Sequence, residues 1–160
     1  MRPVLQDIAE SCGETVDLAV FRTDHMVFVD QVVGTHRVRT VSGVGETFPL
    51  ISTANGKAAL ALLDDEVAIA LAVRELKSSH SEKPLSALVA ELEEIRTTGL
   101  AWDCNEHTDG LSAVGFGFRD SSGQIYALSV PVPSYRFAKS RKRIAELLKT
   151  TAPRISALIS

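Results

Sequence analysis

A Gly-Lys pair, Gly56-Lys57, lies at the start of an expected helix in the stretch PLISTANGKAALALL. A nucleotide-binding phosphate loop also places Gly-Lys there, but it requires a glycine five residues earlier and Ser or Thr directly after the lysine. Those positions hold Ile51 and Ala58, so the template fails at both ends. A first helical turn still offers free N–H groups and a positive dipole end. The stretch therefore indicates either an ordinary helix start, capped within Ser52-Thr53, or a cradle for a small carboxylate.

Two neighbouring expected strands each present a face of small residues. Alternate residues of a strand share a face. Ala113, Gly115 and Gly117 therefore lie together on the first strand, and Ala127 and Ser129 lie together on the second, with bulky residues opposite. Either a helix packs closely against this small-residue face, or the space above it holds a ligand.

The remaining reactive residues give weaker signals. Cys104 and His107 have a C-x-x-H spacing that suits zinc, and Cys12 is a candidate third ligand, but a closed zinc site needs four. Asp103 either contacts a ligand hydroxyl or is a surface carboxylate at a strand end. No Gly-x-Ser-x-Gly elbow occurs, so no serine stands out as a nucleophile. These residues predict no catalytic, metal or cofactor site.

The length and composition indicate one compact domain. The chain has 160 residues, 45% hydrophobic and 23% charged, which is enough apolar material for a core. No apolar run reaches the ~18 residues of a membrane span, and the polar start does not resemble a signal peptide, so we expect a cytoplasmic protein. The net charge of -3 gives no general attraction to nucleic acid. The basic residues from Arg136 to Arg143 are interpreted as the solvated start of the last helix, with a DNA or subunit contact as the alternative.

The elements that must position these residues are read from hydrophobic periodicity and from turn residues. We expect a helix over 4–12, a hairpin over 15–33 with its turn at Thr23-Asp24, a polar loop, helices over 53–63, 64–76 and 84–98, a strand over 100–104, a second hairpin over 111–133, and a last helix over 139–159 that Pro153 kinks or splits. The strand at 16–20 is expected to have one buried face. Hairpins joined by helices predict an α/β (α+β) fold with a mostly antiparallel sheet and helices packed on it.

Several segments, in order, resemble the effector-binding domain of the IclR family of bacterial transcriptional regulators. They are SCGETVDLAVF, VDQVVG, VGETFPLISTANGKAALALL, the long stretch from ELEEIRTTGLAWDC to VPVPSYRF, and the closing helix. The most specific parts are GETV, the G-x-x-x-PL…GKA helix entry and the glycine of EHTDGLSAVG before a hairpin. The resemblance implies a GAF-like domain over 14–160, preceded at 1–13 by the end of a linker helix. The family's N-terminal winged helix-turn-helix domain is absent from this chain.

The resemblance also implies where a ligand lies. In this family it lies between the loop before the GKA helix, the first turn of that helix and the central strands. By position, the implied ligand-binding residues are Thr40, Phe48, Ala54, Asn55, Asp103, Leu111, Ala113, Ser129 and Pro131.

The chain departs from family members that bind very small keto acids. Those members tend to have Cys and a second Ser in place of Ala113 and Pro131, and Gly-Ala in place of Ala54-Asn55. Losing two polar groups and gaining an amide favours a larger acid, aromatic acids included.

The expected function is therefore ligand sensing by a homodimeric or homotetrameric transcriptional regulator. A small organic acid effector would control operator DNA binding by the N-terminal domain. Two other classes stay open: an oligomerisation module without a ligand, and a small enzyme using Asp103 or a histidine as base on an organic acid.

Overall fold

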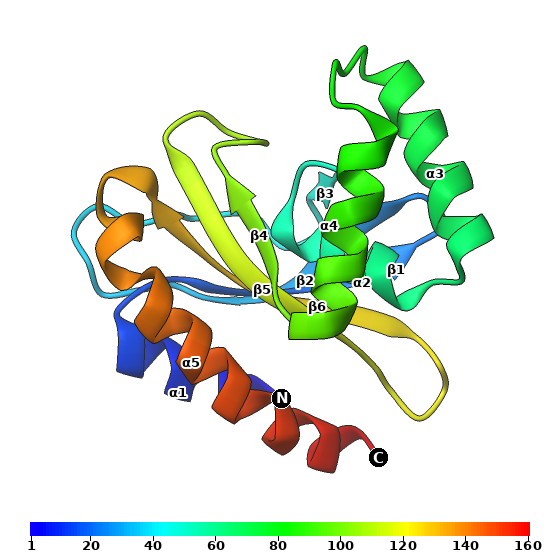
Figure 1. Ribbon diagram of the computed structural model, residues 1–160. Helices are drawn as coiled ribbons and strands as arrows, with labels where there is room; N and C mark the ends of the chain where they lie inside the picture. The colour runs from blue at the N-terminus through cyan, green and yellow to red at the C-terminus, as the bar shows by residue number, and fades with distance from the viewer.

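The computed structural model describes residues 1–160 and contains one six-stranded antiparallel sheet with helices on both faces (Figure 1). In chain order the elements are α1 (Arg2–Cys12), β1 (Val16–Arg22), β2 (His25–Val32), β3 (Thr47–Phe48), α2 (Ala54–Leu62), α3 (Asp65–Ser78), α4 (Leu85–Thr98), β4 (Ala101–Cys104), β5 (Leu111–Arg119), β6 (Ile125–Pro133) and α5 (Ser134–Ile159). The strand order is β3-β2-β1-β6-β5-β4, and every neighbouring pair is antiparallel. This architecture confirms the predicted mixed fold with a mostly antiparallel sheet.

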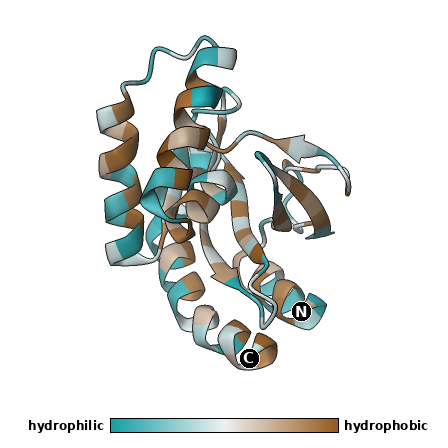
Figure 2. Ribbon diagram, turned by 90° about the vertical axis from the view of Figure 1, so that its right-hand side faces the viewer, coloured by the Kyte–Doolittle hydropathy of each residue, from teal (hydrophilic) through white to brown (hydrophobic).

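The sheet separates two hydrophobic cores. On one face, α1 and α5 lie side by side and cover residues such as Val16, Val114 and Leu128. On the other face, α2 lies against the strands with α3 and α4 outside it, around Ala19 and Ala127. Figure 2, turned by 90°, shows the same two helix groups on either side of strands that are rich in hydrophobic residues. Both layers bury apolar surface, which is the main stabilising term of such a domain.

Local sequence signals set most element boundaries. Gly13 and Gly99 end α1 and α4 in the left-handed conformation, with φ of 75° and 81°, which glycine adopts without a Cβ penalty. Thr53 caps α2, because its side chain accepts a hydrogen bond from the N–H of Gly56 at 3.0 Å. The β1–β2 hairpin turns at Thr23-Asp24 as expected.

Two expectations about the elements are wrong. Strand β1 is buried on both faces, because α2 and the loop before it cover the face that carries Asp17 and Ala19. Helix α5 starts at Ser134 rather than at 139 and runs unbroken through Pro153. Its first turn is held to the sheet by the hydrogen bond between the Ser112 and Ser134 hydroxyls at 2.9 Å. Proline removes one backbone hydrogen bond, but the buried side chains on either side of Pro153 keep the helix seated on the core.

No helix of the structure combines the length and the apolar character that crossing a membrane requires.

Candidate functional site

A cavity lies between the start of α2, the sheet and the loop before β3. Its volume is about 60 Å³. The structure brings all nine residues of the sequence prediction to this one cavity, and none lies elsewhere. Its lining consists of Asp17, Phe28, Thr40, Ser42, Phe48, Thr53, Ala54, Asn55, Asp103, His107, Leu111, Ala113, Ser129 and Pro131. The co-location is a property of the fold; ligand binding by these residues stays a prediction.

The sequence left two alternatives for the small-residue face of the sheet, close helix packing or a space for a ligand. The structure shows both a packed helix and a cavity on this face. Toward one end of β5, a Cβ on Gly117 would lie 2.9 Å from the carbonyl oxygen of Ala58, so α2 packs directly on the sheet there. Toward the other end, Asp103, Ala113 and Pro131 form one row across β4, β5 and β6 and face the cavity. The helix packing and the cavity therefore occur side by side on the same face.

The start of α2 supplies the donors of the cavity. The N–H groups of Ala54 and Asn55 precede the first intrahelical bond, which Lys57 makes to the Thr53 carbonyl at 3.0 Å, and neither has a partner. The Asn55 side chain is buried; its oxygen lies 3.1 Å from the Thr53 hydroxyl, which also donates to the Pro49 carbonyl at 2.7 Å, and its amide nitrogen has no hydrogen-bond partner. We define these three N–H groups as the donor end. They suit an anion because the positive end of the helix dipole lies at the same place.

Three other residues of the lining, on β1, β6 and the loop before β3, carry unpaired oxygens. Asp17 is 2% exposed, and its Oδ1 accepts from Gln31 Nε2 at 2.6 Å while its Oδ2 has no partner. Ser129, directly opposite Asp17 in the β1–β6 pairing, makes no side-chain hydrogen bond. The Thr40 hydroxyl is buried without any partner. We define Asp17 Oδ2, Ser129 Oγ and Thr40 Oγ1 as the acceptor end.

Burial sets the protonation of the two carboxyl groups. Desolvation raises the pKa of Asp17 to about 7, against a smaller lowering by the Gln31 hydrogen bond and a further raising by Glu46. Desolvation also raises the pKa of Asp103, whose Oδ1 accepts from the N–H of Glu106 at 2.8 Å. Asp103 is therefore a buried cavity residue, and its reading as a surface carboxylate is wrong.

The lysine of the Gly-Lys pair does not face the cavity opening. Lys57 is 0% exposed, and its Nζ lies 2.8 Å from Glu91 Oε2 and 2.7 Å from Glu106 Oε1. Lys83 contacts the same two carboxylates and completes a cluster of two positive and two negative charges. These contacts use the ammonium group fully, so Lys57 fixes the β4–β5 loop rather than serving a phosphate group.

The glycine of the pair allows a close backbone approach. A Cβ on Gly56 would lie 2.5 Å from both Cα and the carbonyl oxygen of Leu50. The preceding segment, 49–51, is also held by Glu75, whose carboxylate accepts from the N–H groups of Leu50 and Ile51 at 2.9–3.0 Å. The absence of a side chain at Gly56 therefore allows the start of α2, with its donor end, to lie directly against residues 49–51.

An aromatic wall closes one side of the cavity. The rings of Phe28 and Phe48 stack with their centroids 4.4 Å apart. His107, on the β4–β5 loop, meets the edge of Phe48 at 5.2 Å between centroids. The wall restricts the space to flat or compact molecules.

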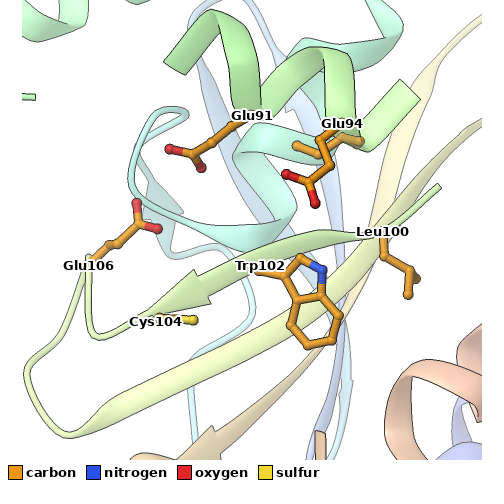
Figure 3. Close-up of a pocket in the computed structure, with 7 residues that line it drawn as sticks. Glu91, Glu94, Leu100, Trp102, Cys104 and Glu106 are labelled. Atoms are coloured by element: carbon orange, nitrogen blue, oxygen red, sulfur yellow. The ribbon is translucent and has the colours of Figure 1, made fainter. Parts of the chain in front are cut away.

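A second hollow lies on the outer side of the charge cluster, between α4 and β4 (Figure 3). Its volume is about 130 Å³, and Glu91 and Glu106 project into it from opposite sides above Trp102. Cys104 lies at its rim, exposed, whereas Cys12, the last residue of α1, is buried in the core. Nowhere in the chain do three His, Cys, Asp or Glu side chains gather in a metal-binding arrangement. This hollow carries no ligand argument, since two of its three carboxylates, those of Glu91 and Glu106, are already paired with lysines.

Five lining residues escaped the sequence reasoning: Asp17, Phe28, Ser42, Thr53 and His107. A signal existed for one of them. Thr53 was recognised as a cap, and a cap residue borders the first turn that it closes. The single buried face expected for the strand at 16–20 gives no reason to place Asp17 in a cavity, and its burial follows from the coverage of both faces of β1.

Comparisons with known proteins agree with this geometry. The family model described as "Bacterial transcriptional regulator IclR C-terminal" matches residues 1–157. The chain is 41% identical over 159 residues to the HTH-type transcriptional regulator Rv1719 of Mycobacterium tuberculosis, covering 98% of this chain and 61% of that protein. It is 33% identical to the HTH-type transcriptional regulator TtgV of Pseudomonas putida, covering 92% and 57%. The crystal structure of the Thermotoga maritima IclR superposes with a TM-score of 0.86 at 30% identity, covering 99% of this chain and 66% of that chain.

The fold and these matches define a regulatory domain rather than an enzyme, because the curated relatives are named as transcriptional regulators or repressors. The chain belongs to the IclR family of bacterial transcriptional regulators and corresponds to their C-terminal effector domain. It spans about three fifths of the length of the curated relatives described above.

Proposed function

We propose that this domain binds a small organic acid in the cavity at the start of α2 and thereby controls operator binding by an N-terminal DNA-binding domain. The observation that carries the proposal is the donor end: two free N–H groups and an unpaired amide, buried above a cavity at the positive end of a helix. A carboxylate satisfies all three donors, and charge-assisted hydrogen bonds of this kind are the strong ones.

The size of the cavity favours a compact acid. An engineered cavity of roughly 150 Å³ holds one benzene molecule, whereas this cavity measures about 60 Å³. The aromatic acid favoured by the sequence departures therefore requires the loop that carries Thr40 and the Phe28–Phe48 wall to move outward. A compact acid requires a smaller movement of the same loop and wall.

The proposed regulator works by shifting a population of conformations. An effector changes DNA affinity only by its differential affinity for the two arrangements, typically worth about 1–3 kcal/mol. We place the regulator in the cytoplasm and expect a homodimer or homotetramer, since operators of such proteins are usually symmetric.

A thermal-shift screen of this domain tests the proposal. The panel contains short keto, hydroxy, sugar and aromatic acids, each offered at high concentration. A ligand at a hundred times its dissociation constant stabilises the folded state by about 2.7 kcal/mol, a clear rise in melting temperature. The rise should disappear in Asn55→Ala and persist in Gln6→Ala, which removes an exposed amide on α1 that makes no side-chain hydrogen bond. If no acid raises the melting temperature, the domain is an assembly module and the proposal fails.

A further inference from the structure

We propose that the effector is a hydroxy acid, and that Asp17 selects its hydroxyl group. The inference rests on the proposed function, because it concerns the same cavity, and it names the ligand class by matching the two ends of that cavity. Asp17 is a specificity-determining residue that neither the sequence motifs nor the resemblance singled out.

The two ends require different chemical groups. The donor end offers only N–H groups, so its partner must be an acceptor. The acceptor end holds Asp17, and above the pKa of this carboxyl, about 7, a second carboxylate beside it would bring two like charges together out of water. The acid group of the ligand therefore lies at the start of α2, and the group beside Asp17 must donate a hydrogen.

The ligand group beside Asp17 must accept a hydrogen bond as well as donate one. The hydroxyls of Ser129 and Thr40 each carry a hydrogen that no protein atom receives. A ligand hydroxyl donates to Asp17 Oδ2 and accepts from one of these hydroxyls. An ammonium group has three donors and no acceptor, so it cannot receive either hydrogen. A hydroxyl matches the acceptor end, and an ammonium does not.

The protein holds the acceptor end in place before a ligand arrives. Gln31 donates to Asp17 Oδ1 at 2.6 Å and accepts from the N–H of Ser42 at 3.3 Å. Thr15 donates its hydroxyl to the carbonyl of Thr40 at 2.7 Å, which fixes the residue that carries the unpaired Oγ1. Asp17 Oδ2 therefore has a set direction, and a molecule that lacks a hydroxyl leaves it unpaired.

Matched acids test the class directly by titration calorimetry of the unaltered domain at pH 8, where the Asp17 carboxyl is ionised. The probes are lactate, propionate and alanine, and the longer set 3-hydroxybutyrate, butyrate and 3-aminobutyrate. In at least one set the hydroxy acid should bind at least about tenfold more tightly than the unsubstituted and amino acids, the usual effect of one hydrogen bond to a charged group.

The variant Asp17→Asn tests the residue. Gln31 Nε2 must still meet an acceptor, so it turns the new amide oxygen toward itself and the amide nitrogen toward the cavity. The acceptor becomes a donor, and the preference for the hydroxy acid should fall to within about threefold of the unsubstituted acid. The control Asp109→Asn removes the same charge from an exposed position without side-chain hydrogen bonds and should keep the preference.

Each outcome decides a different claim. Equal binding of the hydroxy and unsubstituted acids, or tighter binding of the amino acid, overturns the hydroxy-acid class while leaving acid sensing intact. An unchanged preference in Asp17→Asn overturns the role of Asp17. Binding of no acid in either set or in the wider screen removes the proposed function itself.

Discussion

The Nζ of Lys57 lies 2.7 Å from Oε1 of Glu106, and the backbone N–H of Glu106 lies 2.8 Å from Oδ1 of Asp103. One residue of the β4–β5 loop thus joins a buried lysine of α2 to a buried carboxyl of the cavity. The loop wall, including His107, depends on this connection.

Replacing Lys57 by Met should destabilise the domain and loosen that loop. The methionine fills the space but leaves Glu91 and Glu106 with Lys83 alone, at sites about one-third exposed. We expect a loss of about 2 kcal/mol, below the range for fully buried pairs because solvent screens the carboxylates. Urea unfolding measures the loss, with the exposed Lys77→Met as control. A loss no larger than that of the control would mean that the charge cluster contributes nothing net.

Replacing Gly56 by Ala should displace the start of α2. The new Cβ would stand 2.5 Å from backbone atoms of Leu50, and backbone cannot rotate away. Overpacking of this kind costs about 1–3 kcal/mol, more than the helix propensity that alanine regains. Acid binding should weaken with stability, as melting temperatures with and without ligand will show. The comparison is Gly43→Ala, whose Cβ would meet only the mobile carboxylate of Glu46 at 2.8 Å.

The stability of the domain should fall as pH rises from about 4 to about 7, through Asp17. Its pKa is about 7 when folded and about 4 when unfolded, so the folded state keeps a proton that the unfolded state has released. Stability from this group is complete below the unfolded pKa and is lost as pH rises through the folded one, by up to roughly 4 kcal/mol. Gln31 and Glu46 face the group, and neither supplies a positive charge.

The variant Asp17→Asn isolates this dependence. Its unfolding free energy, measured in urea from pH 4 to 8, should be flatter than that of the unaltered domain and should exceed it at pH 8. The difference between the two curves removes the contributions of Asp103 and of other groups. Parallel curves would show that Asp17 titrates alike in both states.

Replacing Arg136 by Met should destabilise the domain more than replacing it by Lys. Arg136 binds both oxygens of Glu14, at 2.8 and 2.7 Å, and Glu14 is 2% exposed. Removing the guanidinium leaves the buried carboxylate of Glu14 with only the His36 ring beside it, at 3.5 Å, at a cost of about 3 kcal/mol, whereas lysine keeps the charge and loses the paired geometry. Denaturant midpoints rank the two variants, and the exposed Lys142→Met serves as the reference. The ranking is refuted if Met and Lys give the same midpoint.

The sequence predicts which residues line the cavity better than it predicts which charged groups are buried and how they are paired. Alternation along β5 and β6 fixes which residues share a face, and the capping hydroxyl of Thr53 fixes where α2 begins, so the lining could be inferred locally together with the family resemblance. The partners of Lys57 lie 34 and 49 residues away, and no local pattern encodes such pairs. The burial of Asp17 likewise depends on α2 and the loop before it covering a face that alternation alone assigns to solvent.

Alternate residues of strand β1 face the two sides of the sheet, one toward the cavity and two toward helix α1. Asp17 lines the cavity, while Val16 and Leu18 pack in the cluster that holds α1. The three residues are consecutive in the chain, so a ligand that displaced Asp17 in the proposed site would act directly on the two neighbours that contact the other core. The proposed effector site and the residues that hold α1 are therefore separated by the thickness of one strand.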